Sequence, residues 1–235
     1  MPVNKRILFS IMGWGLGHAT RCIPIINSLM KDNHVTLSSN GISATLLRQE
    51  FPTLKCIDYP DYAVNYPQNK MMFLPRMAFQ LPNIIIKLIK EYLQTQKVIK
   101  DENIDIIISD SRYGVISKGI PTIFIMHQLR FQFSGIYKTI EFLGEWFNLF
   151  MFTKYSQIII PDVKMIPNLT GDLTHFGKIA HHPKLHYLGV FCSVTMLNVK
   201  EDIDYLFSVS GPEIQRTIFE EIILDQIKNF QVKKW

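Results

Sequence analysis

Residues 7–21 read ILFSIMGWGLGHATR. An apolar run of strand length enters a turn with glycine at positions 13, 15 and 17, and a helical pattern leaves it. Glycine adopts backbone conformations closed to other residues and lets a ligand approach closely. The helix that follows directs its first free N–H groups and its positive dipole end into the turn. Such a turn suits a phosphate, another anion, or a polar group that needs several backbone donors.

Several uses of this glycine turn compete. A nicotinamide-type fingerprint needs G-x-G-x-x-G and an acidic residue after the second strand. Here Gly17 comes one residue early, His18 stands in the third glycine's place, and Ser38–Asn40 contain no acid. The Gly-Lys-Ser/Thr of a nucleotide-hydrolase loop is absent. The interpretation that these glycines form only a tight turn of an ordinary α/β domain also stays open at this point.

The composition limits the class of protein. The chain has 235 residues, of which 47% are hydrophobic, so one large domain with a sizeable core is available. The net charge of +5 favours an acidic partner such as phosphates or an anionic membrane face. Basic and aromatic residues do not alternate as a stacking platform for nucleic acid requires, so no nucleic-acid partner is expected.

The cysteines, histidines and chain start bear on location and metals. Cys22, Cys56 and Cys192 fit no disulfide or metal spacing, and cytoplasmic free thiols are the simplest account. The histidines between His175 and His186 match no ligand rule, so no metal is expected. Met1–Arg6 leads directly into a strand, which argues against a signal peptide. No apolar run reaches the roughly 20 residues of a membrane span.

Strand and helix patterns alternate along the chain. The predicted strands cover residues 7–12, 35–38, 55–59, 104–109, 121–126, 157–160 and 187–190. The predicted helices cover 18–31, 42–51, 71–100 (interrupted near Pro75 and Pro82) and 134–153. This order predicts an α/β fold, a Rossmann-like parallel sheet with helices on both faces. Ligands of such sheets bind at the carboxyl ends of the strands, where the glycine turn lies.

Polar groups follow three of the other predicted strands. Asp110, His127 and Asp162 each come at or just after a strand end, and Arg112 follows closely. A carboxylate, an imidazole and a guanidinium on one rim beside His18 would supply an acid–base site. A purely structural role for each of these residues remains an alternative. Asp110 would cap a helix or pair with Arg112, His127 would be a hydrogen-bonded core histidine, and Asp162 is favoured as a turn cap.

Two apolar stretches allow a membrane or a packing role. Met71–Tyr92 mixes apolar residues with basic ones such as Lys87 and Lys90, as a membrane-surface patch that admits a lipid acceptor would. Packing of its apolar face on the sheet, with the lysines in water, is the favoured alternative. For Phe142–Phe152, which includes Trp146, burial is expected.

The opening pattern recurs near the end of the sequence. A predicted strand over 204–209 enters a Ser210-Gly211-Pro212 turn, and an amphipathic helix over 213–230 follows. Proline suits a helix start. Free N–H groups of the turn and the Arg216 side chain would contact an anion. One strand and one helix cannot bury their own apolar face, so we expect these residues to begin a second domain that is missing.

Five segments now occur in register: Gly13–Arg21, Ser109–Gly114, His127–Leu129, Asn168–His175 and Ser210–Thr217. Together they resemble a bacterial and archaeal family of glycosyltransferases. That family is similar to the family 28 enzyme that adds N-acetylglucosamine to the peptidoglycan lipid precursor. The resemblance covers essentially the whole chain.

The resemblance implies a GT-B enzyme, with two Rossmann-like domains facing each other across a cleft. Such enzymes need no metal or other cofactor and use a nucleotide-diphosphate sugar, which we expect here to be a uridine diphosphate sugar. Residues 1–191 would form the acceptor-side domain, 192–203 a linker, and 204–235 the start of the donor-binding domain. The acceptor would be lipid-linked or a glycan, which places the chain in the cytoplasm or at the inner face of the membrane.

The resemblance also implies roles for residues. His18 would be the catalytic base or position the sugar, with Asp110 as its competitor. The contacts to acceptor and transferred sugar would come from Gly13, Gly15, Gly17, Arg21, Arg112, His127 and Gln128. The contacts to the donor diphosphate would come from Ser210, Gly211, Glu213 and Arg216.

The family's chains continue for roughly another domain. We therefore expect this chain to bind donor weakly and to transfer little sugar unless the missing domain is supplied in cis or in trans. The alternative is a non-catalytic module that binds an anionic glycolipid or a partner protein.

Overall fold

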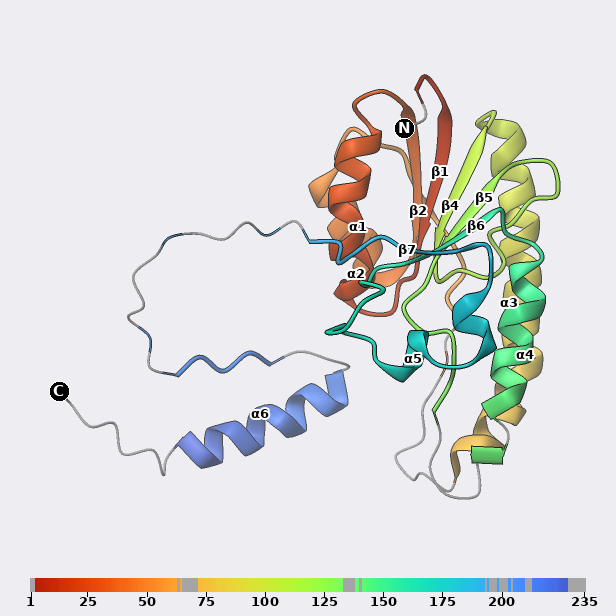
Figure 1. Ribbon diagram of the computed structural model, residues 1–235. Coiled ribbons are helices and arrows are strands. Elements are labelled where there is room, and N and C mark those ends of the chain that lie inside the picture. The colour runs from red at the N-terminus through yellow and green to blue at the C-terminus, as the bar shows by residue number, and fades with distance from the viewer. Residues whose placement is uncertain are drawn as a thin grey trace. The chain divides into compact units, whose positions relative to one another are not determined.

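A seven-stranded parallel sheet forms the centre of the first structural unit in this computed structural model (Figure 1). The strands lie in the order β3-β2-β1-β4-β5-β6-β7, and every neighbouring pair is parallel. Their bounds are β1 (Arg6–Ile11), β2 (His34–Ser39), β3 (Cys56–Asp58), β4 (Ile106–Asp110), β5 (Thr122–Ile125), β6 (Gln157–Ile160) and β7 (Leu185–Tyr187).

Two structural units make up the chain, Met1–Ser193 and Val194–Trp235. The structure describes residues 3–62, 64, 72–132, 138–139, 141–192, 194, 198, 203, 205–209 and 213–227. None of the helices in these ranges combines the length and the apolar character that crossing a bilayer requires.

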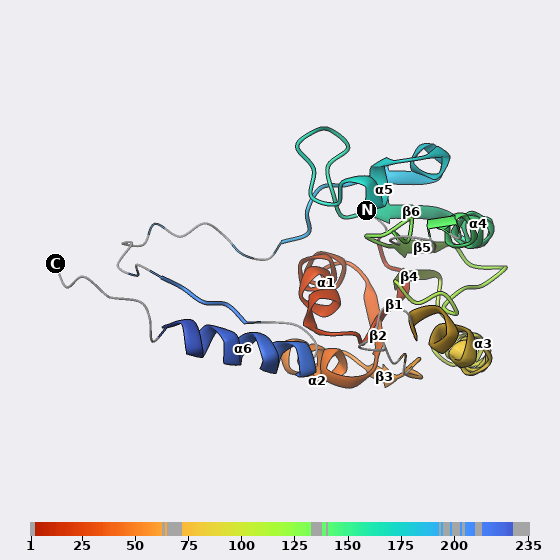
Figure 2. The same cartoon turned by 90° about the horizontal axis from the view of Figure 1, so that it is seen from below.

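Helices cover both faces of the sheet. Figure 2 shows α1 and α2 on one face and α3 and α4 on the other. The helices of this unit are α1 (Leu16–Leu29), α2 (Gly41–Glu50), α3 (Phe73–Asp101), α4 (Glu141–Phe152) and the short α5 (Asp172–His175), which a 3-10 turn follows (Lys178–His181). The predicted Rossmann-like α/β fold is confirmed.

The core explains why most of the first strand is apolar. Ile7, Phe9 and Ile11 belong to the hydrophobic cluster beneath α1, whereas Leu8 belongs to the cluster that includes Val98 of α3. Successive strand residues point to opposite faces of a sheet, and here both faces are covered. A strand in this position therefore needs apolar residues on both of its faces.

Strand register places the glycine turn beside Asp110. β1 lies between β2 and β4, and Ile11 is paired with Asp110. The turn that follows β1 and the carboxylate that ends β4 therefore emerge at the same edge of the sheet. The pairing of β1 with β4 therefore sets where the polar groups of the site lie.

The helix predicted over 71–100 is more regular than expected. The interruptions near Pro75 and Pro82 are not formed, because α3 is a single helix of 29 residues. Pro75 lies in the first turn, where its missing N–H removes no intrahelical bond. Pro82 removes one bond inside the helix.

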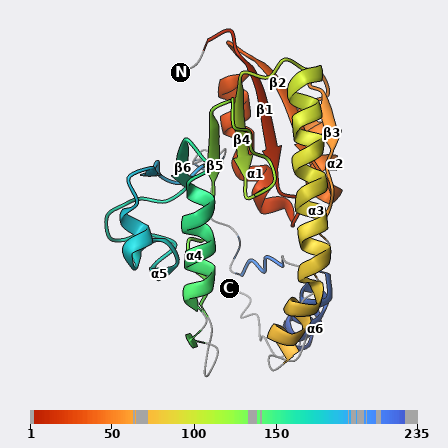
Figure 3. The same ribbon diagram turned by 90° about the vertical axis from the view of Figure 1, so that its right-hand side faces the viewer.

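The N-terminal half of α3 does not pack on the sheet, so the favoured expectation for Met71–Tyr92 is wrong there. A 29-residue helix is about 44 Å long, whereas a strand of five or six residues spans about 17–20 Å. Figure 3 shows this half of α3 extending past the ends of the strands. Phe79 is 86% exposed, and Leu81 and Ile86 are also exposed, while Val98 in the other half is buried.

The burial expected for Phe142–Phe152 is wrong for most aromatic residues of α4. Phe142, Trp146 and Phe150 are exposed, and the last two rings stack with centroids 6.2 Å apart. Met151, in the last turn, is buried. Phe147 lies beside the Tyr113 ring, with centroids 5.4 Å apart, and Phe152 is fully buried, so the side chains of α4 that pack on the rest of the unit gather toward its C-terminal end.

The bounds of the last strand also differ from the prediction. β7 (Leu185–Tyr187) precedes most of the predicted strand over 187–190, because its backbone pairs with Ile158–Ile160. For the helix predicted over 134–153, residues 134–137 and 140 lie outside the described residues, and α4 covers Glu141–Phe152.

The second unit contains α6 (Glu213–Ile227). Residues 205–209 have irregular backbone, so the strand predicted over 204–209 is not formed there. A strand needs a hydrogen-bonded neighbour, and the described residues of this unit contain no second extended segment to pair with it. The last three residues of the predicted helix, 228–230, lie outside the described residues.

Candidate active site

The glycine turn holds an open corner between β1 and α1. Gly15 precedes the first helical residue and has a φ of 74°, in the left-handed region that favours glycine. Its carbonyl oxygen accepts a hydrogen bond of 2.8 Å from the Ser43 hydroxyl. No heavy atom lies within 4 Å of a Cβ built on Gly17, and Leu16 and Gly17 are exposed. A ligand can therefore approach the N-terminal end of α1.

Gly13 is required for a different reason. A Cβ at this position would lie 2.4 Å from Oδ1 of Asn40. The Asn40 side chain cannot easily move aside, because its Oδ1 accepts a 2.6 Å hydrogen bond from Nη1 of the buried Arg112. The close approach of β1 to the start of α2 therefore needs a residue without a side chain.

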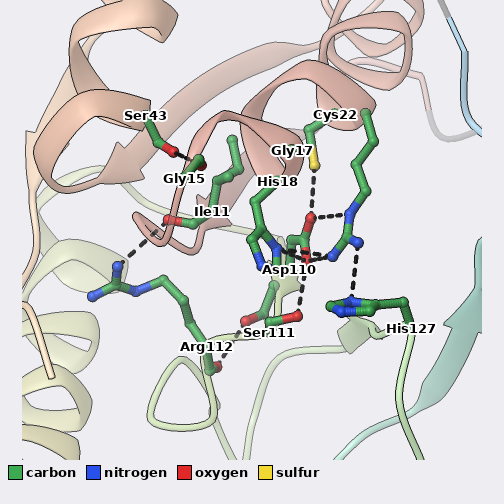
Figure 4. Close-up of polar contacts among 12 residues, drawn as sticks. Ile11, Gly15, Gly17, His18, Cys22, Ser43, Asp110, Ser111, Arg112 and His127 are labelled. Carbon is green, nitrogen blue, oxygen red and sulfur yellow. Dashed lines mark hydrogen bonds and ion pairs between the residues drawn. The ribbon is translucent and has the colours of Figure 1, made fainter. Parts of the chain in front are cut away.

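Asp110 is the centre of a polar cluster at the carboxyl edge of the sheet (Figure 4). Its Oδ1 lies 3.1 Å from Nδ1 of His18 and accepts hydrogen bonds from Nη2 of Arg21 and, at 3.0 Å, from the Ser111 hydroxyl. Its Oδ2 accepts hydrogen bonds from Nε of Arg21 at 2.7 Å and from the Cys22 thiol at 3.1 Å. The carboxylate is fully buried, and all of these donors are side chains.

Helix periodicity explains how α1 supplies three of these partners. His18, Arg21 and Cys22 are three and four residues apart, so they share one face of the helix. The strand register brings that face over Asp110. The first turn of α1 and the end of β4 therefore build the cluster together.

Charge keeps the Asp110 carboxyl ionised despite its burial. Burial alone would raise its pKa, but the hydrogen bond from His18 and the Arg21 guanidinium outweigh that effect and hold the pKa well below its usual range. Burial, then the neighbouring Asp110 charge, raise the pKa of the Cys22 thiol well above its ordinary value. Cys22 is therefore a neutral donor here.

His127 completes the rim just after β5. Its Nδ1 lies 3.1 Å from Nη1 of Arg21, and its ring meets the His18 ring edge-on with centroids 5.5 Å apart. Desolvation by surrounding atoms, followed by the charge of Arg21, lowers the pKa of His127 to about 4. The residue is exposed, which excludes the core alternative, and Gln128 beside it is half-buried.

Arg112 does not lie on the rim, which corrects its predicted contact with substrate. The side chain is fully buried, and its Nε donates to Oε1 of Glu91 at 2.5 Å. Its two terminal nitrogens donate to Asn40 and to backbone carbonyl oxygens. The alternative in which Asp110 pairs with Arg112 is also wrong, because Arg21 holds that carboxylate. Arg112 fixes the interior beneath the glycine turn.

Asp162 caps its own loop, as its favoured alternative predicted. The buried carboxylate accepts hydrogen bonds from the backbone N–H groups of Val163, Leu169 and Thr170 at 2.7 to 3.1 Å, and from the Thr170 hydroxyl at 2.5 Å. Burial would raise its pKa, but these donors lower it below its usual range. Nε2 of His175 lies 3.4 Å from the carboxylate, beyond the usual range for such a bond.

The predicted donor-side residues belong to the second unit. Ser210 and Gly211 lie outside the described residues. Glu213 begins α6, and Arg216 is exposed in its first turn. Their contacts with a diphosphate stay predictions. Within the described residues, no three histidine, cysteine or acidic side chains are arranged to hold a metal ion.

Three donors to Asp110 were missed from the sequence. Arg21 was expected to contact substrate, not to bind the carboxylate, and Cys22 was considered only as a free thiol. The spacing from His18 was a usable signal for both, because residues three and four positions apart share a helix face. Ser111, with a φ of 61°, gave no signal in the sequence.

The parallel sheet, the glycine turn and the polar rim define an α/β protein of the Rossmann-like class with its candidate site at the carboxyl edge. The chain belongs to the family described as Glycosyl transferase family 1, whose sequence profile matches residues 5–123. The glycosyltransferase family predicted from the five segments is therefore confirmed. The chain is glycosyltransferase-like in family and in fold.

Comparison with solved structures finds similar chains of low identity. They include the glycosyltransferase SsfS6 of Streptomyces sp. SF2575 (11% identity, 67% of this chain and 50% of that chain, TM-score 0.43). Another is MurG of Acinetobacter baumannii (11%, 69% and 43%, TM-score 0.44). A third is a putative UDP-N-acetylglucosamine 2-epimerase of Listeria monocytogenes (12%, 68% and 39%, TM-score 0.43). The chain spans half or less of each. A search of curated protein sequences found no match.

Proposed function

We propose that this chain carries the acceptor side of a glycosyltransferase that moves a hexosyl group from a nucleotide-diphosphate sugar to a lipid-linked or glycan acceptor. The observation that carries the proposal is the His18–Asp110 pair, with Nδ1 and Oδ1 3.1 Å apart at the mouth of the glycine turn. Membership of the glycosyltransferase family supports the reaction class.

His18 is the general base in this proposal. Its Nδ1 lies between the Asp110 carboxylate and Nη2 of Arg21, which is 2.9 Å away. When the ring proton is on Nδ1 and directed at Asp110, the opposite nitrogen, Nε2, carries a free lone pair. Nε2 takes the proton of the acceptor hydroxyl. The hydroxyl oxygen bonds to the anomeric carbon, and the bond from that carbon to the diphosphate breaks, its electron pair leaving with the nucleoside diphosphate.

Asp110 is a positioning residue for His18 in this scheme. Its fully buried carboxylate reaches an acceptor only through the imidazole, so we do not assign it the role of base. Its charge holds the ring in one orientation and favours the imidazolium that forms when His18 takes a proton. The Arg21 guanidinium keeps the carboxylate ionised for this purpose.

The glycine turn contributes backbone donors. Gly17 has open space above it, and the first residues of α1 have free N–H groups at the positive end of the helix dipole. We propose that these groups face an oxygen of the transferred sugar or of the acceptor. The proposal needs no metal ion.

The donor side of the reaction is proposed from the resemblance. Ser210, Gly211, Glu213 and Arg216 would contact the donor diphosphate, and the donor would be a uridine diphosphate sugar. SsfS6 has also been solved with thymidine diphosphate. Because enzymes of this class bind most of the donor in a second domain, we propose that these 235 residues bind donor weakly and transfer slowly unless that domain is supplied.

We further propose that the exposed faces of α3 and α4 meet the inner face of a membrane. Exposed apolar side chains on both helices, such as Phe79 and Trp146, accompany basic residues such as Lys87 and Lys90. Apolar and basic groups together favour an anionic membrane surface. An apolar groove of about 230 Å³ lies between the helices and would admit part of a lipid acceptor.

The test compares His18→Ala with His34→Ala in the purified chain. Nucleoside diphosphate release from a set of uridine and thymidine diphosphate sugars is measured at high protein concentration. We expect slow release in the wild type and a loss of about 100-fold or more in His18→Ala. His34 is exposed at the start of β2, at the other edge of the sheet, so His34→Ala should match the wild type. Equal release by His18→Ala would contradict the proposed base.

The alternative of a non-catalytic module is not favoured, because the family is one of enzymes. A non-catalytic module would bind anionic vesicles equally well with and without His18→Ala. Binding of donor sugars, seen as a rise in melting temperature that His18→Ala does not abolish, would separate substrate binding from chemistry.

A further inference from the structure

Arg21 contacts both imidazoles of the rim, but the two are held differently. Nδ1 of His18 lies 3.1 Å from Oδ1 of Asp110, an acceptor, and 2.9 Å from Nη2 of Arg21, a donor, so its tautomer decides which of the two it bonds. Nδ1 of His127 lies 3.1 Å from Nη1 of Arg21. Among the hydrogen bonds described here, His127 Nδ1 thus meets a donor and His18 Nδ1 meets both a donor and an acceptor.

This difference determines where each ring can carry its proton. A guanidinium has five N–H donors, no acceptor and a permanent charge. A nitrogen that receives its hydrogen bond must therefore be unprotonated. For His127 the proton of the neutral ring is then on Nε2, on the side of the ring away from Arg21. His18, beside both kinds of partner, can carry its proton on Nδ1 and direct it at Asp110.

We propose that Arg21 fixes His127 as the neutral Nε2–H tautomer, which makes His127 a hydrogen-bond donor to a substrate oxygen beside His18 and not a second base. The donor role rests on the proposed glycosyl transfer. The tautomer does not, because it follows from the Arg21–His127 contact alone. Arg21 is the positioning residue, and His127 sets which substrate atoms the rim accepts.

The electrostatic surroundings of His127 support this assignment. The groups that face its ring are the Arg21 guanidinium, the His18 imidazole and the Asp110 carboxylate. Desolvation, and then the Arg21 charge, lowers the pKa of His127 to about 4, so the ring is neutral at pH 7. Arg21 itself stays in place because Asp110 accepts two of its hydrogen bonds.

The consequence concerns the kind of oxygen that fits at the rim. A fixed N–H donor rewards an oxygen with a free lone pair, such as a hydroxyl, ether or carbonyl oxygen of the acceptor or the transferred sugar. A substrate that presents an N–H group at that point would leave two donors facing each other. The rim therefore selects for an oxygen next to the reacting hydroxyl.

The first experiment measures tautomers directly, in the full 235-residue chain. Nitrogen-15 correlation spectra of the histidine rings at pH 7 are assigned with His127→Gln, His18→Gln and the control His34→Gln. We expect a His127 ring protonated on Nε2 and unprotonated on Nδ1. A His127 ring protonated on Nδ1, or on both nitrogens, would overturn the inference without any variant having to be active.

Substitution of Arg21 tests the cause. Arg21→Lys keeps a charge for the buried Asp110 but lacks the planar fork that reaches both the carboxylate and His127. We expect His127 in this variant to become a mixture of tautomers and its pKa to rise from about 4 toward the ordinary histidine value. An unchanged His127 spectrum in folded Arg21→Lys would assign the tautomer to something other than Arg21 and would overturn the proposal.

The second experiment tests the donor role. Glutamine at position 127 offers an N–H donor near the place of Nε2, whereas glutamate offers acceptors alone. We expect His127→Glu to transfer about 10-fold or more slowly than His127→Gln at low acceptor concentration, since glutamate cannot donate to the substrate oxygen and a hydrogen bond left unmade is costly. Equal rates would overturn the donor role.

The outcomes separate the inference from the proposed function. Absence of transfer from every nucleotide sugar in the wild type would remove the proposed function, while the His127 spectrum would still decide the tautomer. A His18 ring that carries its proton permanently on Nε2 would contradict the proposed base and leave the assignment of His127 intact. An Nδ1-protonated His127 with normal transfer would do the reverse.

Discussion

Asp110 and Asp162 are both fully buried carboxylates near the carboxyl ends of strands, and each has a histidine close by. Their donors differ. Asp110 is held by side chains from another element, chiefly the charged Arg21 and the imidazole of His18. Asp162 is held mostly by backbone N–H groups of the loop that follows it and by the Thr170 hydroxyl.

The comparison separates a carboxylate that serves chemistry from one that closes a loop. A carboxylate satisfied by backbone groups fixes the chain that supplies them, and it needs no other charge. A carboxylate held by a guanidinium and an imidazole orients that imidazole, which a ligand can reach. Position at a strand end is common to both, so the kind of donor distinguishes them.

The largest effect is expected from Asp110→Asn. The variant leaves the Arg21 charge in a buried site without its carboxylate, which costs about 3–5 kcal/mol of unfolding free energy. The new amide can also donate to Nδ1 of His18, which would place the ring proton on Nε2 and remove the base. We expect transfer to fall by about 100-fold or more. Urea unfolding and nucleoside diphosphate release measure the two effects.

Asp32→Asn is the matched control for this substitution. Asp32 is exposed in the turn before β2, and the same change there should alter the unfolding free energy by no more than about 0.5 kcal/mol. Wild-type stability in Asp110→Asn would contradict the view that Arg21 depends on this carboxylate.

The sheet and its active edge were predictable because their signals are local. Each strand is a short apolar run, and β6 was predicted at its observed bounds because Gln157–Ile160 lies between clear turn residues. The glycine turn marks the end of β1, and parallel strands bring their carboxyl ends to one edge. Those facts are enough to place His18 beside Asp110.

The partners of the two arginines were not predictable, because they depend on contacts between distant segments. Arg112 follows Asp110 by two residues and was expected beside it, but its partner Glu91 comes from α3, 21 residues earlier. Arg21 binds a carboxylate 89 residues away. A sequence pattern gives the face of a helix on which a side chain lies, and only the packed fold decides what that face meets.

The exposed half of α3 was missed for a related reason. Its amphipathic pattern predicts an apolar face but gives no information on the area of sheet available to cover it. The strands are shorter than the helix, and Phe79 and other apolar residues of its N-terminal half are exposed. The same limit applies to Trp146 on α4.

A smaller effect is expected from Asp162→Asn. The amide nitrogen would replace one carboxylate oxygen and face the N–H groups of Leu169 and Thr170. Leaving these donors without an acceptor should cost about 1–3 kcal/mol. Because this carboxylate does not reach His18, transfer per folded molecule should stay within about threefold of the wild type.

Asp172→Asn is the control, since Asp172 is exposed at the start of α5 and should tolerate the change within about 0.5 kcal/mol. The comparison between the two carboxylates fails if Asp162→Asn loses transfer as strongly as Asp110→Asn does while remaining folded. That result would give the Asp162 loop a direct part in the reaction.

The smallest effects are expected in the slope of the unfolding free energy against pH. Asp162 and His127 affect this slope in two different pH ranges. The folded pKa of Asp162 is lowered, so its contribution to stability is complete above the unfolded value of about 3.9 and is lost as the pH falls through the folded value. The folded pKa of His127 is also lowered, to about 4, so the unfolded chain binds more protons between pH 4 and about 6.5. Stability therefore rises with pH across both ranges.

Asp162→Asn should flatten the slope below about pH 4, and His127→Gln should flatten it between about pH 4 and 6.5. Urea unfolding at half-unit steps from pH 3 to 7 measures both slopes. An Asp162→Asn slope as steep as that of the wild type at low pH would mean that the backbone donors of the loop do not hold an ionised carboxylate, and the contrast with Asp110 would be lost.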